Sequence, residues 1–131
     1  MTDRSAFTAT GLSASLTAND LAASVAWYRD VLGFTVEREF ERDGVSFAAR
    51  LRAGEVAILL TQDNGAKGAG RAKGEGMSLQ FTTKEDIDTL AASAKSQGAT
   101  LDTEPTDMAG ARAFRLRDPD GFRLVISSER K

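Results

Sequence analysis

The tripeptide Arg-Leu-Arg occurs twice in this chain, at residues 50–52 and again at residues 115–117, and both copies lead through a turn into an apolar run. The match continues upstream at nearly the same offset, because Asp20-Leu21 corresponds to Asp86-Ile87. A constant offset of this kind is typical of a duplicated supersecondary unit. Two units are too few to stack as a solenoid, so they must close on each other to bury their apolar faces.

The first unit shows the periodicity of one strand, one helix and three further strands. Apolar residues alternate with Ser and Thr from Leu12 to Ala18, which is typical of a strand with one buried face. A helical stripe begins at Leu21, and Gly33 is suited to end the helix because it adopts positive φ without strain. Asp43-Gly44 is typical of a two-residue type I′ hairpin. The elements are therefore expected at about 12–18, 21–32, 34–41, 45–52 and 55–61.

The second unit repeats this order with weaker patterns. Thr83 and Asp86 resemble a capping box at the start of its helix, and Gly98 is expected to end that helix. The run Asp-Pro-Asp-Gly at 118–121 indicates a turn, with Pro at the second position and Gly where positive φ is needed. We therefore interpret both aspartates as turn formers and not as the acids of an active site. The strands of this unit are expected at about 77–81, 99–104, 111–117 and 122–127.

The chain is predicted to form one domain, residues 1–131, with an α+β fold. Its hydrophobic residues make up 41% and its charged residues 27%, as in ordinary soluble domains. Module one is placed at about 10–62 and module two at about 76–128. Residues 63–75 between them are rich in glycine and are expected to form a flexible linker, with a mobile lid over a pocket as the alternative.

Charge and composition exclude several classes of function. A formal net charge of −2 gives no basic field to attract nucleic acid or an anionic membrane. No apolar run is long enough to cross a membrane, and the N-terminal sequence lacks the pattern of a signal peptide, so we expect a cytoplasmic protein. Cysteine and histidine are both absent from the chain, which removes disulfides, thiolate nucleophiles and the commonest metal ligand.

Two motifs connect the chain with a known family. DLAASVAWYRDVLGF, which begins at Asp20, and RLRDPDGFRLVI, which begins at Arg115, resemble the vicinal oxygen chelate superfamily, as does the duplicated order of elements. That superfamily includes glyoxalase I, bleomycin-resistance proteins and extradiol dioxygenases. The resemblance covers residues 10–128 and implies two tandem β-α-β-β-β modules that form a curled mixed sheet, a half-barrel, with helices on the convex face. It also implies a ligand site on the concave face and a homodimer.

Metal-using members of that family hold the ion with His, Glu or Gln on the first and last strands of each module. Carried over to this chain, those positions fall at Ser13, Ile58, Ser78 and Val125. None of these side chains is an ordinary ligand of a catalytic divalent metal. We therefore predict no metal site, no cofactor and no catalytic residue of the family type.

Strand alternation also predicts which side chains line the concave face. The ligand-binding residues are expected to be Ser13, Arg50, Ile58, Leu60, Ser78, Gln80, Arg115, Arg123 and Val125. This mixture of apolar, hydroxyl, amide and guanidinium groups is typical of a small-molecule site. Arg50 and Arg115 lie further from the turns than Arg52 and Arg117. The first pair is therefore assigned to a carboxylate or phosphate of the ligand, and the second to water or a nearby acid.

The resulting prediction is a metal-independent small-molecule binding protein of the glyoxalase/bleomycin-resistance type. Its ligand is expected to be apolar, aromatic or anionic and to lie in the cleft of a homodimer, with sequestration or resistance as the role. Two alternatives stay open. One is a metal-dependent glyoxalase-type lyase or isomerase, or a dioxygenase; the other is a dimeric interaction module with a vestigial pocket.

Overall fold

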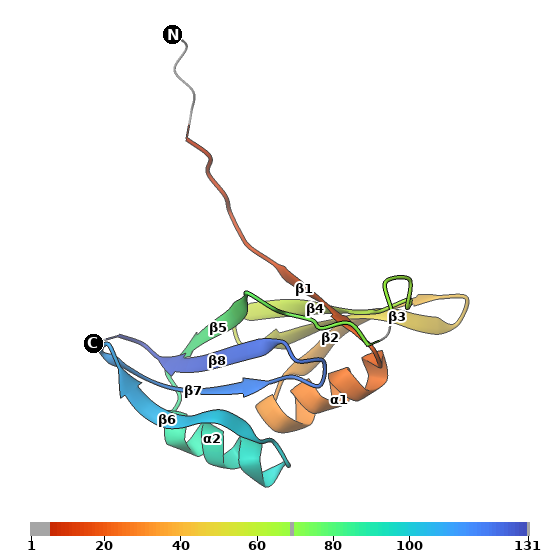
Figure 1. Ribbon diagram of the computed structural model, residues 1–131. Helices are drawn as coiled ribbons and strands as arrows, with labels where there is room; N and C mark the ends of the chain where they lie inside the picture. The colour runs from red at the N-terminus through yellow and green to blue at the C-terminus, as the bar shows by residue number, and fades with distance from the viewer. Residues whose placement is uncertain (1–5, 69, 131) are drawn as a thin grey trace.

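The computed structural model describes residues 6–68 and 70–130 and shows the expected order of elements in each module (Figure 1). Module one consists of β1 (Ala14–Ala18), α1 (Leu21–Leu32), β2 (Thr35–Arg42), β3 (Val45–Ala53) and β4 (Val56–Gln62). Module two consists of β5 (Ser78–Thr83), α2 (Ile87–Ser96), β6 (Leu101–Met108), β7 (Ala111–Arg117) and β8 (Arg123–Ser128). The predicted β-α-β-β-β order is confirmed in both modules.

Each module forms its own four-stranded mixed sheet. The strand order is β1-β4-β3-β2 in the first sheet and β5-β8-β7-β6 in the second. In both sheets the first strand of the module runs parallel to the last, and the other neighbours are antiparallel. The predicted α+β class is therefore confirmed, with one topology used twice. Among the described residues the two sheets share no strand pair, and their curling into one half-barrel stays a prediction.

Local sequence sets the ends of the elements in module one. The Asp20 carboxylate accepts a hydrogen bond from the Ala23 N–H at the start of α1, and Gly33 ends the helix with φ at 78°. Asp43 and Gly44 have φ of 54° and 77°, which confirms the two-residue turn between β2 and β3. These ends were predictable because the hydrogen bonds that fix them span only a few residues.

Helix α2 begins later than a Thr83 cap would place it. The Asp86 carboxylate accepts hydrogen bonds from the N–H and the hydroxyl of Thr89, at 2.9 and 2.8 Å, and so caps the helix itself. The Thr83 hydroxyl instead accepts from the N–H of Glu85. The predicted capping box is therefore wrong, because the carboxylate of Asp86 competes with Thr83 for the capping role.

In the part of the chain that the structure describes, no helix is long and apolar enough to cross a membrane.

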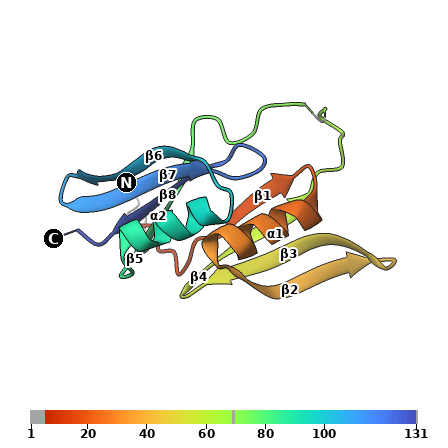
Figure 2. The same cartoon turned by 90° about the horizontal axis from the view of Figure 1, so that it is seen from below.

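The two modules share one hydrophobic core, formed by the helix-facing side of each sheet and by both helices. Helices α1 and α2 lie side by side (Figure 2). Aromatic rings connect the modules edge to face: the ring centroids of Tyr28 and Phe34 are 5.4 Å apart, and those of Phe34 and Phe81 are 5.9 Å apart. Each module thus covers apolar surface of the other.

A buried hydrogen-bond network joins the last turn of module two to helix α1. The hydroxyl of Tyr28, whose side chain is fully buried, donates to the Asp118 carboxylate at 2.7 Å. The same carboxylate accepts from the N–H groups of Asp120 and Phe122, and the Asp120 carboxylate accepts from the Ser24 hydroxyl. Burial raises the pKa of both Asp118 and Tyr28 above their ordinary values. The two aspartates therefore do more than form a turn.

The glycine-rich segment between β4 and β5 is anchored to module one near both of its ends, by a hydrogen bond from the Asp63 N–H to the Ala18 carbonyl at 2.8 Å and by Lys73. The Lys73 side chain, only 1% exposed, forms an ion pair with Asp63 at 2.8 Å. Its ammonium also donates to the side-chain oxygen of Asn19 at 2.9 Å. The hydrogen bond from Lys73 lowers the pKa of Asp63 to about 2. This lysine belongs to the segment that composition predicted to be a flexible linker.

Replacing Lys73 with Met is expected to reduce the acid sensitivity of folding. Asp63 has a pKa of about 2 in the folded chain against 3.8 ordinarily, so its contribution to stability is complete above pH 3.8 and is lost as the pH falls toward 2. Without the ammonium, the unfolding free energy should vary less steeply with pH in this window. Urea unfolding at a series of pH values measures the slope, with Lys67→Met as a control on the same segment. Equal slopes for K73M and the unaltered protein would contradict the assignment.

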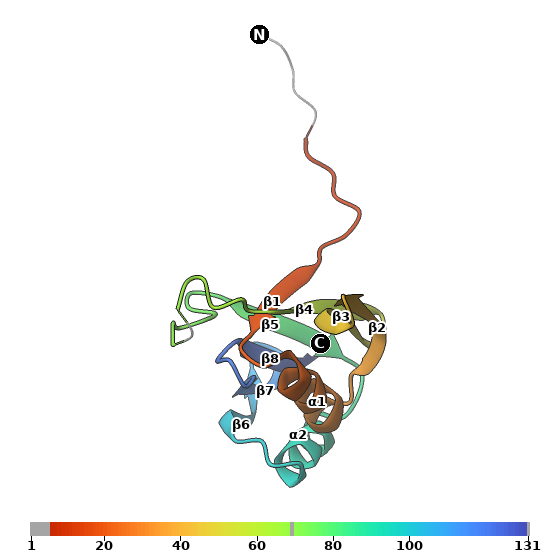
Figure 3. The same ribbon diagram turned by 90° about the vertical axis from the view of Figure 1, so that its right-hand side faces the viewer.

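Residues 6–13 lead away from the body of the molecule (Figures 1 and 3). Phe7 and Leu12 in this arm are 92% and 100% exposed. Alternation placed Leu12 in the first strand, but β1 begins only at Ala14. The packed part of the domain therefore starts two residues later than the pattern predicts.

Candidate functional site

Each sheet has one face toward the helices and an opposite face, which we call the outer face. In the second sheet Ser78 lies opposite Arg123, and Val125 lies between Gln80 on one side and Arg115 on the other. Directly opposite residues share a face of a sheet, and side chains two apart on a strand also share one. Five of the predicted site residues therefore lie together on the outer face of module two.

A hollow of about 610 Å³ lies on this outer face, a volume suited to a small organic ligand. Four of the predicted residues line it, namely Ser78, Arg115, Arg123 and Val125. Gln80 lies two residues beyond Ser78 on the same face. We call this feature the arginine hollow; its lining is Gly76, Met77, Ser78, Asp102, Thr103, Arg115, Leu116, Arg117, Arg123, Leu124 and Val125.

The arginine hollow has an excess of positive charge. Arg117 donates to the Asp102 carboxylate at 3.0 Å, as predicted for an arginine beside a turn. Arg123 lies directly across from Arg117, and like charges in that position destabilise a sheet. Within residues 6–68 and 70–130, neither Arg115 nor Arg123 forms an ion pair. An anion bound beside Arg115 and Arg123 would offset the positive charge of the hollow and reduce the repulsion between Arg123 and Arg117.

Arg50 and Ser13, the other polar residues predicted for the site, belong to module one. The Arg50 guanidinium lies on the outer face of the first sheet, 6.0 Å from the centroid of the Phe40 ring. Arg52, beside the turn, forms an ion pair with Glu37 at 3.2 Å. Ser13 is exposed just before β1. Neither Arg50 nor Ser13 lines the arginine hollow, so one chain alone does not join the two halves of the predicted site.

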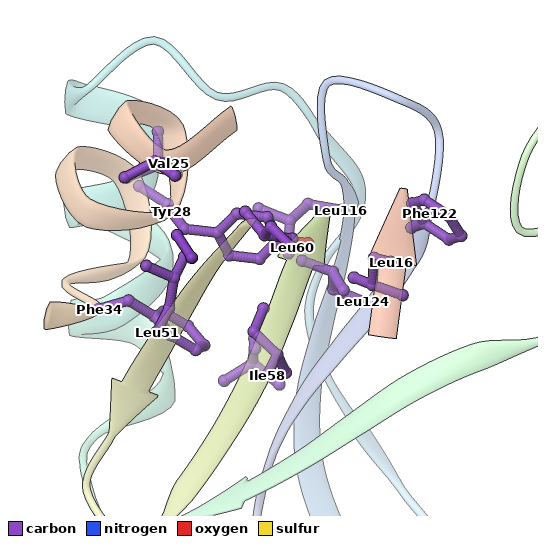
Figure 4. Packing of buried hydrophobic residues seen from close by; sticks show 14 of the residues in the cluster. Leu16, Val25, Tyr28, Phe34, Leu51, Ile58, Leu60, Leu116, Phe122 and Leu124 are labelled. Atoms are coloured by element: carbon purple, nitrogen blue, oxygen red, sulfur yellow. The ribbon is translucent and has the colours of Figure 1, made fainter. Parts of the chain in front are cut away.

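Ile58 and Leu60 do not lie on the outer face, and the prediction that they share a face with Arg50 is wrong. Ile58 lies opposite Leu51 across the β3–β4 pair, and both pack in the core together with Leu60 (Figure 4). The outer-face position opposite Arg50 belongs to Leu59. The β4 segment VAILL is apolar throughout, so alternation could not fix its register, and a slip of one residue exchanges the two faces.

The sequence did not predict that β6 takes part in the hollow. Asp102 and Thr103 line it from this strand. The pairing of β6 with β7 shifts register between Leu101 and Thr103, so the period of two that guided the other strands is interrupted there. The one sequence signal for Asp102 was the expectation that Arg117 pairs with an acid. The chain has 19 acidic residues, so this expectation could not identify which one.

Residues 11–126 match the family model of the Glyoxalase/Bleomycin resistance protein/Dioxygenase superfamily. The chain belongs to this superfamily. The resemblance predicted from the two sequence motifs is thus confirmed. No curated protein matches the chain.

Solved structures of the glyoxalase/bleomycin-resistance superfamily and of other proteins share the fold. TioX from Micromonospora sp. ML1 superposes with a TM-score of 0.72 at 20% identity, covering 92% of this chain and 98% of TioX. The glyoxylase/bleomycin resistance protein/dioxygenase domain from Frankia sp. EAN1pec superposes with a TM-score of 0.74 at 22% identity, covering 95% of each chain. An integron cassette protein of V. cholerae superposes with a TM-score of 0.73 at 23% identity, covering 94% of this chain and 98% of the cassette protein. At these identities the likeness establishes the fold alone.

The positions at which superfamily members hold a divalent metal do not fit such an ion in this chain. With the register corrected, they carry Ser13, Leu59, Ser78 and Val125, which are two hydroxyls and two hydrocarbon side chains. A catalytic divalent metal needs several imidazole, carboxylate or thiolate donors that converge. Among the described residues, no group of three or more acidic, His or Cys side chains is placed to hold an ion.

Proposed function

We propose that this superfamily member is a metal-independent small-molecule binding protein whose ligand carries an anionic group on an aromatic or apolar body. The observation that supports it is the convergence of Arg115 and Arg123, unpaired among the described residues, on the arginine hollow. A guanidinium fork binds a carboxylate, sulfonate or phosphate through two parallel hydrogen bonds. The Ser78 hydroxyl adds a further donor, and Val125 adds apolar contact for the ligand body.

The chemistry of the site favours holding a ligand over transforming it. The arginine hollow contains one carboxylate, that of Asp102, and an arginine already engages it at 3.0 Å. A general base must reach the proton that it removes, and Arg117 holds this carboxylate at the edge of the sheet. Guanidinium groups do not release protons at neutral pH. Sequestration of an anionic compound is therefore the role that we propose.

The proposal includes a homodimer, in which the outer face of module one in one copy covers the arginine hollow of the other. That outer face carries Arg50 and Arg38 beside the Phe40 ring, with the Arg38 guanidinium 4.8 Å from the ring centroid. Leu59 is half-buried on the same face. Such a dimer would join the two halves of the predicted site and remove the hollow from bulk water, which strengthens ion pairing with the ligand.

Replacing Arg115 with Ala is expected to weaken binding of an aromatic anion by about 1.5 to 3 kcal/mol, or roughly 10- to 150-fold, because a charged hydrogen bond is lost. Anilinonaphthalene sulfonate is a suitable probe, and its fluorescence reports binding. Phenylnaphthylamine has nearly the same rings without the sulfonate, so R115A should leave its weaker binding unchanged. Arg52→Ala, the equivalent of Arg117 in module one, is the matched control. Equal affinity of the sulfonate for R115A and the unaltered protein would remove Arg115 from the site.

Native mass spectrometry of gently purified protein separates the functional classes. The proposal expects a dimer that carries no stoichiometric metal and that binds the sulfonate probe. Stoichiometric zinc, nickel, iron or manganese would support the alternative of a metal-dependent lyase, isomerase or dioxygenase. A dimer that binds neither metal nor probe would support the interaction module, and either result would overturn the proposal.

A further inference from the structure

A second groove lies between the two modules and shares no lining residue with the arginine hollow. It is formed by the end of α1, the turn between β3 and β4, the end of β5 with the segment after it, and helix α2. Its volume is about 800 Å³, within the range of pockets that enclose small organic molecules. We call it the intermodule groove.

The floor of the intermodule groove is apolar and aromatic. Leu32 of α1, Phe81 of β5 and Leu90 of α2 line it, and each is only partly buried by the rest of the chain. The Phe81 ring packs edge to face on Phe34, with centroids 5.9 Å apart, and Phe34 also lines the groove. The floor therefore presents hydrocarbon to water, and a ligand body that covers it would gain from the hydrophobic effect.

The rim of the groove carries an excess of negative charge. Glu55, Glu85 and Glu129 come from three separate segments, and Lys84 is the one lysine among the lining residues. Within residues 6–68 and 70–130, none of these four side chains forms an ion pair. A fourth carboxylate, that of Asp30, is already paired with Arg29 at 3.0 Å. The net charge of the groove lining is thus negative, opposite in sign to that of the arginine hollow.

We propose that the intermodule groove is a second small-molecule site, selective for a cation with an apolar or aromatic body. The carboxylates of the rim would attract the positive charge, and the partly exposed Phe81 ring offers an aromatic face of the kind that binds organic cations. Because residues of both modules line the groove, a bound cation would also stabilise their packing and raise the temperature of unfolding.

Tetraphenylphosphonium and tetraphenylborate form a matched pair of probes, because they have the same shape and opposite charge. We expect calorimetry at about 0.15 M salt to show binding of the phosphonium. In the Arg115→Ala variant, which weakens the proposed anion site, its affinity should exceed that of the borate by about tenfold or more. Replacing both Glu55 and Glu129 with Gln should remove most of this preference, whereas Glu39→Gln on the exposed strand β2 should not.

Ser93 allows the site to be located without disturbing the core. It is an exposed residue of α2 that lines the groove, and its neighbour Ala92 is also exposed but does not line it. Ser93→Trp should fill the groove and lower the affinity for the phosphonium by about tenfold or more, while Ala92→Trp should leave it unchanged. Arg115→Ala should also leave it unchanged, which separates this site from the proposed anion site.

Three results would overturn the inference. One is the absence of phosphonium binding, and another is equal binding to S93W and A92W. The third is phosphonium affinity that falls as the protein concentration rises, because this would show that a second copy of the chain occupies the groove.

Discussion

Replacing Asp118 with Ala is expected to lower the free energy of unfolding by about 3 to 5 kcal/mol, since three buried or partly buried donors lose their acceptor at once. The Tyr28 hydroxyl and the N–H groups of Asp120 and Phe122 all donate to this carboxylate. The Tyr28 side chain is fully buried, so its hydroxyl would be left in the core without this acceptor. Chemical denaturation of D118A and the unaltered protein measures the difference.

Two comparisons distinguish this network from a general effect of mutation. Asp118→Asn keeps an acceptor oxygen and should cost about half as much or less. Asp102→Ala removes an exposed carboxylate whose ion pair with Arg117 is screened by solvent, so it should change stability by less than about 1 kcal/mol. A loss for D118A no larger than that for D102A would show that the turn does not hold the modules together.

Replacing Gly74 with Ala is expected to cost about 2 to 4 kcal/mol, the sum of a strained backbone and a steric clash. Gly74 has φ of +74°, and a Cβ built there would lie 2.7 Å from Cδ1 and 3.0 Å from Cα of Phe122. The backbone of Phe122 cannot move away easily, because its N–H is bonded to the buried Asp118. Thermal or urea unfolding measures the loss.

Gly76→Ala is a control that isolates the clash. Gly76 has nearly the same φ, +76°, but a Cβ there would meet no atom within 4 Å. Its substitution should therefore cost only the backbone strain, about 1 kcal/mol. Equal losses at the two positions would mean that the glycine-rich segment is not seated against Phe122.

The sequence predicted well where hydrogen bonds are local or a pattern repeats. The turn at Asp43-Gly44 and the end of α1 at Gly33 were found because a few adjacent residues decide the backbone conformation there. The duplicated Arg-Leu-Arg segments placed Arg115 correctly on the outer face, since Leu116 between the arginines is buried. The separate behaviour of Arg117, which pairs with Asp102, also followed from its place beside a turn.

Prediction failed where the residue pattern does not show which face of a strand is buried. In β4 every residue from Val56 to Leu60 is apolar, so the sequence could not show that Leu59 and not Ile58 faces outward. Lys73 lay in a run that composition described only as flexible. Its burial depends on Asp63 at the start of the same segment and on Asn19 in module one.

The amino-acid sequence by itself determined the duplication, the order of elements, the superfamily and the absence of ordinary metal ligands at the family positions. Those properties depend on residue identity and on contacts within a turn or a helix. Only the tertiary structure decided which face of β4 is buried, how Asp118 meets Tyr28 across 90 positions of sequence, and that a groove with an acidic rim lies between the modules. These features depend on strand register and on the packing of one module against the other, which local patterns do not encode.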